Sequence, residues 1–130
     1  MILHKVLGQT AFWLVNKSIA IEFGIEAALL LSDLIDKQTY FKARGELDEE
    51  GFFYNTSEDI EKFTTLNYHS QKKVLKLLIE AGFVTTKLKG VPARLHFKIL
   101  ENQILIFLNT GSQEKGKQDL HNLEINNNID

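Results

Sequence analysis

The chain has 130 residues, about the length of one domain, and is 44% hydrophobic and 25% charged. This composition is typical of a globular protein and excludes a disordered tail protein, a collagen-like repeat and a disulfide scaffold. Because the chain has no cysteine, it has neither a thiol nucleophile nor a cysteine zinc site, and a reducing cytosol fits best.

The first twenty residues are apolar, but they do not have the pattern of a targeting segment. They lack a basic beginning, and Lys5, Asn16 and Lys17 interrupt them, so we expect no signal peptide. No uninterrupted apolar stretch approaches the roughly 18 residues that a membrane span needs. We therefore expect a cytoplasmic protein that does not use a membrane as a partner.

The net charge of −2 hides two halves of opposite sign. Residues 22–61 contain eleven acidic and three basic residues, whereas residues 62–98 contain eight basic residues and Glu80 as the one acidic residue. Such asymmetry indicates partners rather than fold. The basic half can attract a polyanion, and the acidic half, which a polyanion repels, is expected to face solvent or a protein. Chance segregation of solvated charges is the alternative interpretation.

The first elements are read from apolar spacing and capping residues. Residues 2–7 fit a helical turn or a strand, and residues 11–15, which are aromatic and branched, predict a strand. Asn16 is expected to cap a short helix over residues 17–23, which Gly24 ends.

The longest helix is predicted over residues 25–41. Its expected outer side carries Glu26, Asp33 and Lys37, and its wide apolar stripe consists of Ala27, Leu30, Leu31, Leu34, Ile35 and Phe41. Such a stripe is usually the core spine of a small domain. It can also bury one side against a second subunit, so we expect a homodimer in which the apolar amino terminus assists.

An acidic turn and two short helices are expected next. Residues 44–51 predict the turn, and residues 52–54 predict a short strand. Thr56 or Ser57 is then expected to cap a helix whose inward residues are Ile60 and Phe63. Leu66 is the apolar anchor of a tight connection. Asn67 is expected to cap a second helix over residues 68–81, which Gly82 ends.

The remaining elements are a hairpin and a tail. Residues 83–88 and 94–100 alternate enough to be two strands, and the intervening residues 89–93 contain a glycine and a proline. Residues 101–108 favour a helix over a strand. From residue 109 the chain is polar and predicts a linker or tail, with one weak helix over residues 120–125.

Two helices joined by a tight turn and followed by a hairpin predict an α+β, helix-rich winged helix-turn-helix with a C-terminal β-hairpin wing. The second helix has its expected core face at Val74, Leu77, Leu78 and Ala81. Its opposite face presents His69, Lys72, Lys73 and Lys76 at the same spacing, with Ser70 near the helix start. A helix in the major groove of DNA needs this arrangement. A surface helix with a solvated lysine face is the alternative.

The hairpin adds a second basic region. Lys87, Lys89 and Arg94 lie at or near its tip, where a wing would meet the DNA backbone or minor groove. A basic tip can also serve only to keep an edge strand from pairing. Together, the helix face and the tip predict a double-stranded DNA interface at His69, Ser70, Lys72, Lys73, Lys76, Lys87, Lys89 and Arg94.

Three segments, residues 51–61, 66–82 and 89–99, resemble the amino-terminal winged-helix domain of phage and plasmid replication-initiation proteins, including the replisome-organiser type of Gram-positive bacteria. The segment that begins at Gly24 resembles the leading helix of that family, so the resemblance covers about residues 16–99. It implies a domain that binds repeated origin sequences in double-stranded DNA, often as a dimer, and that works with replication proteins.

Three function classes remain open: a replication initiator, a winged-helix transcription regulator, and an interaction module that has lost DNA binding. The domain is expected over residues 16–100, after an amino-terminal extension over residues 1–15 that can assist a dimer contact and before a short element and tail over residues 101–130. The histidines are widely separated, and no phosphate-cradling or nucleophile motif is present. We therefore expect no metal site, no cofactor and no enzymatic activity.

Overall fold

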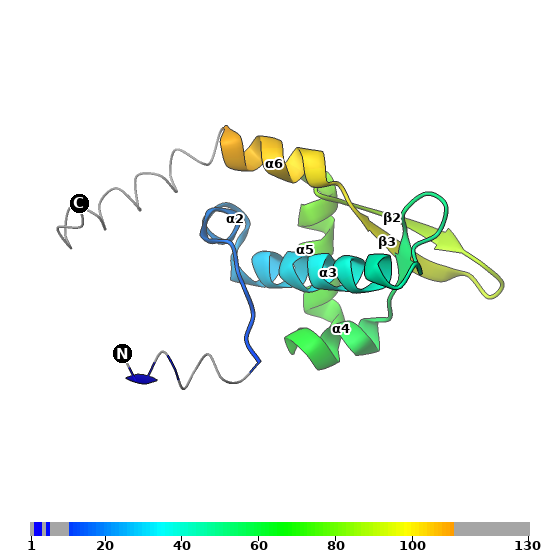
Figure 1. Ribbon diagram of the computed structural model, residues 1–130, viewed down its shortest axis with the longest axis horizontal. Coiled ribbons are helices and arrows are strands. Elements are labelled where there is room, and N and C mark those ends of the chain that lie inside the picture. Colours follow the sequence, from blue (N-terminus) through cyan, green and yellow to red (C-terminus); the bar gives the residue numbers. More distant parts are fainter. Residues whose placement is uncertain (1, 4, 6–10, 111–130) are drawn as a thin grey trace.

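The structure is a computed structural model, and it describes residues 2–3, 5 and 11–110 (Figure 1). Its labelled elements alternate helices with a small sheet, in an α+β arrangement of the winged-helix type. In chain order they are α2 (Lys17–Phe23), α3 (Ile25–Ala43), β1 (Phe53–Tyr54), α4 (Ser57–Thr64), α5 (Tyr68–Glu80), β2 (Val84–Lys89), β3 (Arg94–Ile99) and α6 (Glu101–Asn109).

Helix α3 forms the spine of the domain and packs against α2, α4, α5 and β3. Figure 1 shows it running through the middle of the molecule, with α5 crossing it and the β2–β3 hairpin extending away from the helices. Four residues of the expected apolar stripe are buried in the core of the monomer: Ala27, Leu30, Leu31 and Leu34. This part of the stripe is therefore covered by the chain itself and is not free to meet a second subunit.

Three residues of α3 do not lie on the side that the sequence predicted. Asp33 is buried and the Lys37 side chain is only 14% exposed, and the Lys37 ammonium pairs with the Asp33 carboxylate at 2.6 Å, which offsets the cost of burying the charge. Ile35, which was assigned to the apolar stripe, is exposed.

Local capping sets the helix ends as predicted. The Asn16 side chain accepts a hydrogen bond from the Ile19 backbone N–H at 2.9 Å, and α2 ends at Gly24. The Thr56 hydroxyl caps α4 by accepting from the Asp59 N–H at 3.0 Å, and Asn67 caps α5 by accepting from the Ser70 N–H at 2.9 Å. Each bond satisfies a backbone donor that has no partner within its helix.

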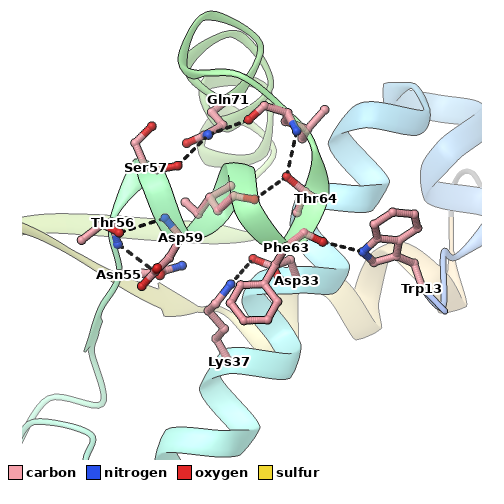
Figure 2. A network of polar contacts seen from close by, with 12 residues as sticks. Trp13, Asp33, Lys37, Asn55, Thr56, Ser57, Asp59, Phe63, Thr64 and Gln71 are labelled. Atoms are coloured by element: carbon pink, nitrogen blue, oxygen red, sulfur yellow. Dashed lines mark hydrogen bonds and ion pairs between the residues drawn. The ribbon is translucent and has the colours of Figure 1, made fainter. Parts of the chain in front are cut away.

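Buried polar contacts hold α4 and α5 at their crossing (Figure 2). The Gln71 amide donates to the Ser57 carbonyl at 3.0 Å and to the Leu66 carbonyl at 2.8 Å. The Thr64 hydroxyl donates to the Ile60 carbonyl at 2.6 Å and accepts from the Leu66 N–H at 3.1 Å. The tight turn between the two helices is therefore a fixed, hydrogen-bonded connection.

The predicted hairpin is confirmed. Strands β2 and β3 pair antiparallel from Val84↔Ile99 to Lys89↔Arg94, and β1 adds to the free side of β3 to give the order β1-β3-β2. At Gly82 the backbone has a φ of +79°, which glycine adopts readily, so α5 turns sharply into β2.

Residues 101–108 belong to helix α6, as favoured from the sequence. Ile104 is buried, and the Phe107 ring lies 5.6 Å from the Phe23 ring and 5.3 Å from the Phe83 ring, so α6 packs on the core. None of the described helices is long and apolar enough to cross a membrane. The weak helix expected over residues 120–125 lies outside the described residues.

The strand predicted over residues 11–15 is wrong. This segment has no regular structure and is mostly exposed. A strand needs a partner edge, and the segment instead runs beside α4, where the Trp13 indole donates to the Phe63 carbonyl at 2.9 Å. The inward position expected for Phe63 is also wrong, because its side chain is 53% exposed.

Candidate nucleic-acid interface

Helix α5 has two faces of opposite character. Val74 and Leu78 are buried on its inner face, together with the hydrogen-bonded Gln71. On the outer face four exposed side chains follow one another at helical spacing: His69, Lys72, Lys73 and Lys76. The Val74 and Leu78 contacts fix the rotation of the helix, so the core itself directs this cationic face to solvent.

The inner face differs in two details from the sequence prediction. Leu77 was expected in the core but is 37% exposed at the flank of the helix, whereas Gln71, which was not expected there, is buried. Ser70 is partly buried, and its backbone N–H is taken up by the Asn67 cap at 2.9 Å.

A groove of about 520 Å³ separates the start of α5 from the part of the wing near its turn. Lys72 lines it from the helix and Arg94 from β3. Both cations lie near aromatic rings, with the Lys72 ammonium 5.8 Å from the Tyr68 ring centre and the Arg94 guanidinium 5.3 Å from that of Tyr54. These tyrosines were not among the predicted site residues, because an isolated tyrosine gives no signal of its own in a sequence.

The two other wing cations are paired with carboxylates. The Lys87 ammonium lies 2.9 Å from the Asp48 carboxylate and 2.6 Å from that of Glu50, and the Lys89 ammonium lies 3.0 Å from Asp48. Lys87 also lies 4.2 Å from the Phe52 ring centre. The loop before β1 therefore folds onto the wing, whereas the sequence reasoning expected the acidic half to face solvent or a protein.

The Asp48 carboxylate is the centre of this contact. Besides the two lysines, it accepts hydrogen bonds from the Glu50 and Phe52 backbone N–H groups, each at 2.9 Å. The hydrogen bond from Lys87, followed by that from the Phe52 backbone, holds the pKa of Asp48 well below its usual range. Glu50 and Asp48 in turn raise the pKa of Lys87.

The predicted cations therefore fall into two groups in the part of the chain that the structure describes. Lys72, Lys73, Lys76 and Arg94 have no ion pair there, whereas Lys87 and Lys89 are matched by carboxylates. Three of the unpaired cations lie on α5, and Arg94 lies next to the turn of the wing. Together with two residues at the start of α5 they form a surface that we call the α5–wing face: His69, Ser70, Lys72, Lys73, Lys76 and Arg94. Within residues 2–3, 5 and 11–110, no three side chains of His, Asp or Glu are grouped to hold a metal ion.

Comparisons with known proteins agree on the fold. No family model and no curated protein sequence matches the chain. Among solved structures, it is similar to a Rep–DNA complex, with a TM-score of 0.57 and 16% identity over 74% of this chain and 79% of that chain. It is also similar to the N-terminal domain of a DNA binding protein, with a TM-score of 0.55 and 17% identity over 88% of this chain and 92% of that chain. At these identities the likeness establishes a shared fold.

Proposed function

We propose that this protein binds double-stranded DNA in a sequence-specific manner and acts in replication initiation of a phage, a plasmid or an integrated mobile element. The observation that carries the proposal is the exposed, unpaired cationic side of α5, the second helix of the helix-turn-helix. Phosphates attract such a surface, and a helix of this kind fits the major groove. The similar solved structure of a Rep–DNA complex supports both DNA as the partner and replication as the process.

The residues of the interface take different roles in this proposal. Lys72, Lys73 and Lys76 make charge contacts, and His69 and Ser70, at the helix start, donate hydrogen bonds to a base edge or a phosphate. Arg94 contacts the flanking backbone from the wing. Lys87 and Lys89 contact that backbone by exchanging their carboxylate partners for phosphates.

The proposed partners, besides DNA, are replication proteins and a second copy of the chain. The chain acts as a binding protein without enzymatic activity, works with replication proteins, and forms a homodimer that matches inverted half-sites. Because the buried part of the α3 stripe is occupied within the monomer, a dimer contact must use other apolar surface. Sedimentation at tens of micromolar, the range in which a working dimer associates, tests this: a dimer is expected, and monomer alone contradicts it.

A selection from a random duplex library tests sequence specificity. The full chain is expected to enrich one repeated motif and to bind an origin region containing that motif more tightly than a scrambled duplex at every salt concentration. Recovery of a motif that lies in a promoter, with none in the origin, supports a transcription regulator instead. Failure to bind any duplex at low salt leaves the interaction module as the remaining interpretation.

A further inference from the structure

A second cavity, of about 840 Å³, lies between α3, α4, the segment of residues 11–13 and residues 54–56, and it shares Tyr54, Asn55 and Thr56 with the groove beside Lys72 and Arg94. Its rim carries large aromatic side chains that remain exposed, with Trp13 49% and Phe63 53% accessible, and Phe12 and Tyr40 beside them. Figure 2 shows the Phe63 ring next to the Asp33–Lys37 pair and Trp13 turned toward the Phe63 carbonyl. Clustered exposed aromatic residues mark interaction sites more often than isolated ones do.

The cavity is also acidic. Asp33, Asp36 and Asp59 line it, and Lys37 is the one cation among its lining residues. Lys37 pairs with Asp33 at 2.6 Å, whereas the Asp36 and Asp59 carboxylates have no ion pair within the described residues. Burial raises the pKa of Asp33, and Asp36 and Asp59 add to this effect against the opposing Lys37. The cavity therefore holds more negative charge than its own lysine balances.

Lys37 itself illustrates how the cavity holds a cation. Its ammonium lies 4.3 Å from the Phe63 ring centre while it pairs with Asp33. An aromatic face combined with a carboxylate is a favourable environment for an ammonium or guanidinium group. Further aromatic rings and the Asp36 and Asp59 carboxylates also line the cavity, so the same kinds of group are available to a second cation.

Asn55 provides an independent sign of a ligand. The residue is only 6% exposed and lies in the wall between this cavity and the groove beside Lys72 and Arg94. The Oδ1 atom accepts a hydrogen bond from the Thr56 N–H at 3.1 Å, which fixes the orientation of the amide. In the part of the chain that the structure describes, Nδ2 is the one buried side-chain nitrogen or oxygen without a hydrogen-bond partner. Buried donors are nearly always paired, and this one matches a carbonyl acceptor supplied from outside.

We propose that this cavity binds a segment of a partner protein that carries an arginine or lysine next to an apolar side chain. The cation lies between Asp36 and Asp59, the apolar side chain packs on Trp13 and Phe63, and a backbone carbonyl of the segment accepts from Asn55 Nδ2. A nucleic acid does not fit this cavity, because the carboxylates repel its phosphates. A small cation does not fit either, because it would leave most of the cavity empty and the Asn55 amide without an acceptor. No residue of α5 lines the cavity, although Tyr54, Asn55 and Thr56 lie between it and the groove beside Lys72 and Arg94.

The chain contains its own reporter, because Trp13 is its one tryptophan and lies at the cavity. The probes are acetyl-arginyl-leucine amide and its matched neutral form, in which citrulline replaces arginine. With the full chain, we expect saturable change of Trp13 fluorescence by the arginine peptide and about tenfold weaker binding of the citrulline peptide, because the charge contacts with both carboxylates are lost.

Variants locate the binding. Asp36→Asn with Asp59→Asn is expected to weaken the arginine peptide by at least about tenfold, whereas the matched control Glu26→Gln with Glu49→Gln, which alters exposed carboxylates outside the cavity, leaves it unchanged. Melting and DNA binding of both variants check that the fold and the α5–wing face are intact.

Several results would overturn the proposal. These are no saturable change with the arginine peptide, equal binding of the citrulline peptide, and parental affinity in the Asp36→Asn, Asp59→Asn variant. A dimer that this variant dissociates would also overturn it, because a second copy of the chain would then occupy the cavity. None of these results depends on whether the chain binds DNA.

Discussion

Removing two lysines from the exposed side of α5 gives a quantitative test of the DNA interface. Lys72 and Lys73 have no ion pair in the described structure and lie opposite the buried Val74 and Leu78. Each phosphate contact contributes about 0.9 to the slope of log affinity against log salt. The Lys72→Ala, Lys73→Ala variant is therefore expected to lower the slope by about two units.

The same relation gives the expected loss of affinity. At 0.15 M salt, two lost contacts weaken binding by about thirtyfold, which turns a complex with a Kd of about 1 μM into one with a Kd of about 30 μM. The fold is expected to remain intact, because alanine is a strong helix former and neither lysine belongs to the core. Fluorescence anisotropy with a labelled duplex at several salt concentrations measures both quantities, and circular dichroism measures the melting temperature.

The matched control variant removes two lysines that lie outside the α5–wing face. Lys17 and Lys42 are exposed on α2 and α3, so the Lys17→Ala, Lys42→Ala variant is expected to keep the parental slope. If the Lys72→Ala, Lys73→Ala variant binds with the parental affinity and slope, or if both double variants lose the same amount, α5 is not the recognition helix.

Three further predictions concern the wing and the core. Asp48→Asn with Glu50→Gln frees Lys87 and Lys89 from their carboxylates, so DNA affinity is expected to rise and the salt slope to steepen by up to about two units. Glu49→Gln, at an exposed carboxylate with no ion pair in the described structure, is expected to change neither. An unchanged double variant would mean that these lysines do not reach DNA. The pKa of Asp48 is lowered in the folded state. The ionised carboxylate therefore stabilises the fold fully at pH values above the ordinary pKa of an aspartate, and this stabilisation is lost as the pH falls through the pKa of the folded state. Urea unfolding between pH 5 and pH 2 is expected to show a larger loss of stability for the parent than for Asp48→Asn, and equal losses would refute the pairing. Leu78→Ala, at a fully buried position, is expected to lower the free energy of unfolding in urea by about 2–5 kcal/mol. Leu77→Ala is expected to lower it by much less, because Leu77 is 37% exposed. Similar losses for the two variants would contradict the orientation of α5.

The parts of the fold that the sequence predicted are those with local causes. Asn16 and Asn67 each cap the helix that follows them, and this signal lies within three residues. The hairpin likewise follows from strand alternation around a glycine and proline turn. The exposed cations of α5 were predictable because helical spacing places them opposite Val74 and Leu78.

The misplaced parts depend on contacts between distant residues. The pairing of Asp48 with Lys87 and Lys89 joins positions about forty apart in the chain, and no spacing rule connects them. Asp33 is an exception, because its partner Lys37 lies only one helical turn away. A carboxylate is rarely buried without a partner, and both side chains of this pair were expected to face solvent. The segment of residues 11–15 has strand-like composition, but no sheet edge is available to it.

Direct mapping of the surface that contacts DNA decides whether α5 is the recognition helix. The full chain, labelled with ¹⁵N, is titrated with a 20-base-pair duplex at moderate salt, and amide shifts are followed by NMR. We expect the largest shifts in residues 68–77 of α5 and residues 90–95 of the wing, with residues 33–40 of α3 unaffected. Shifts centred on α3 and the cavity, or no shift at any residue, would contradict this assignment of α5.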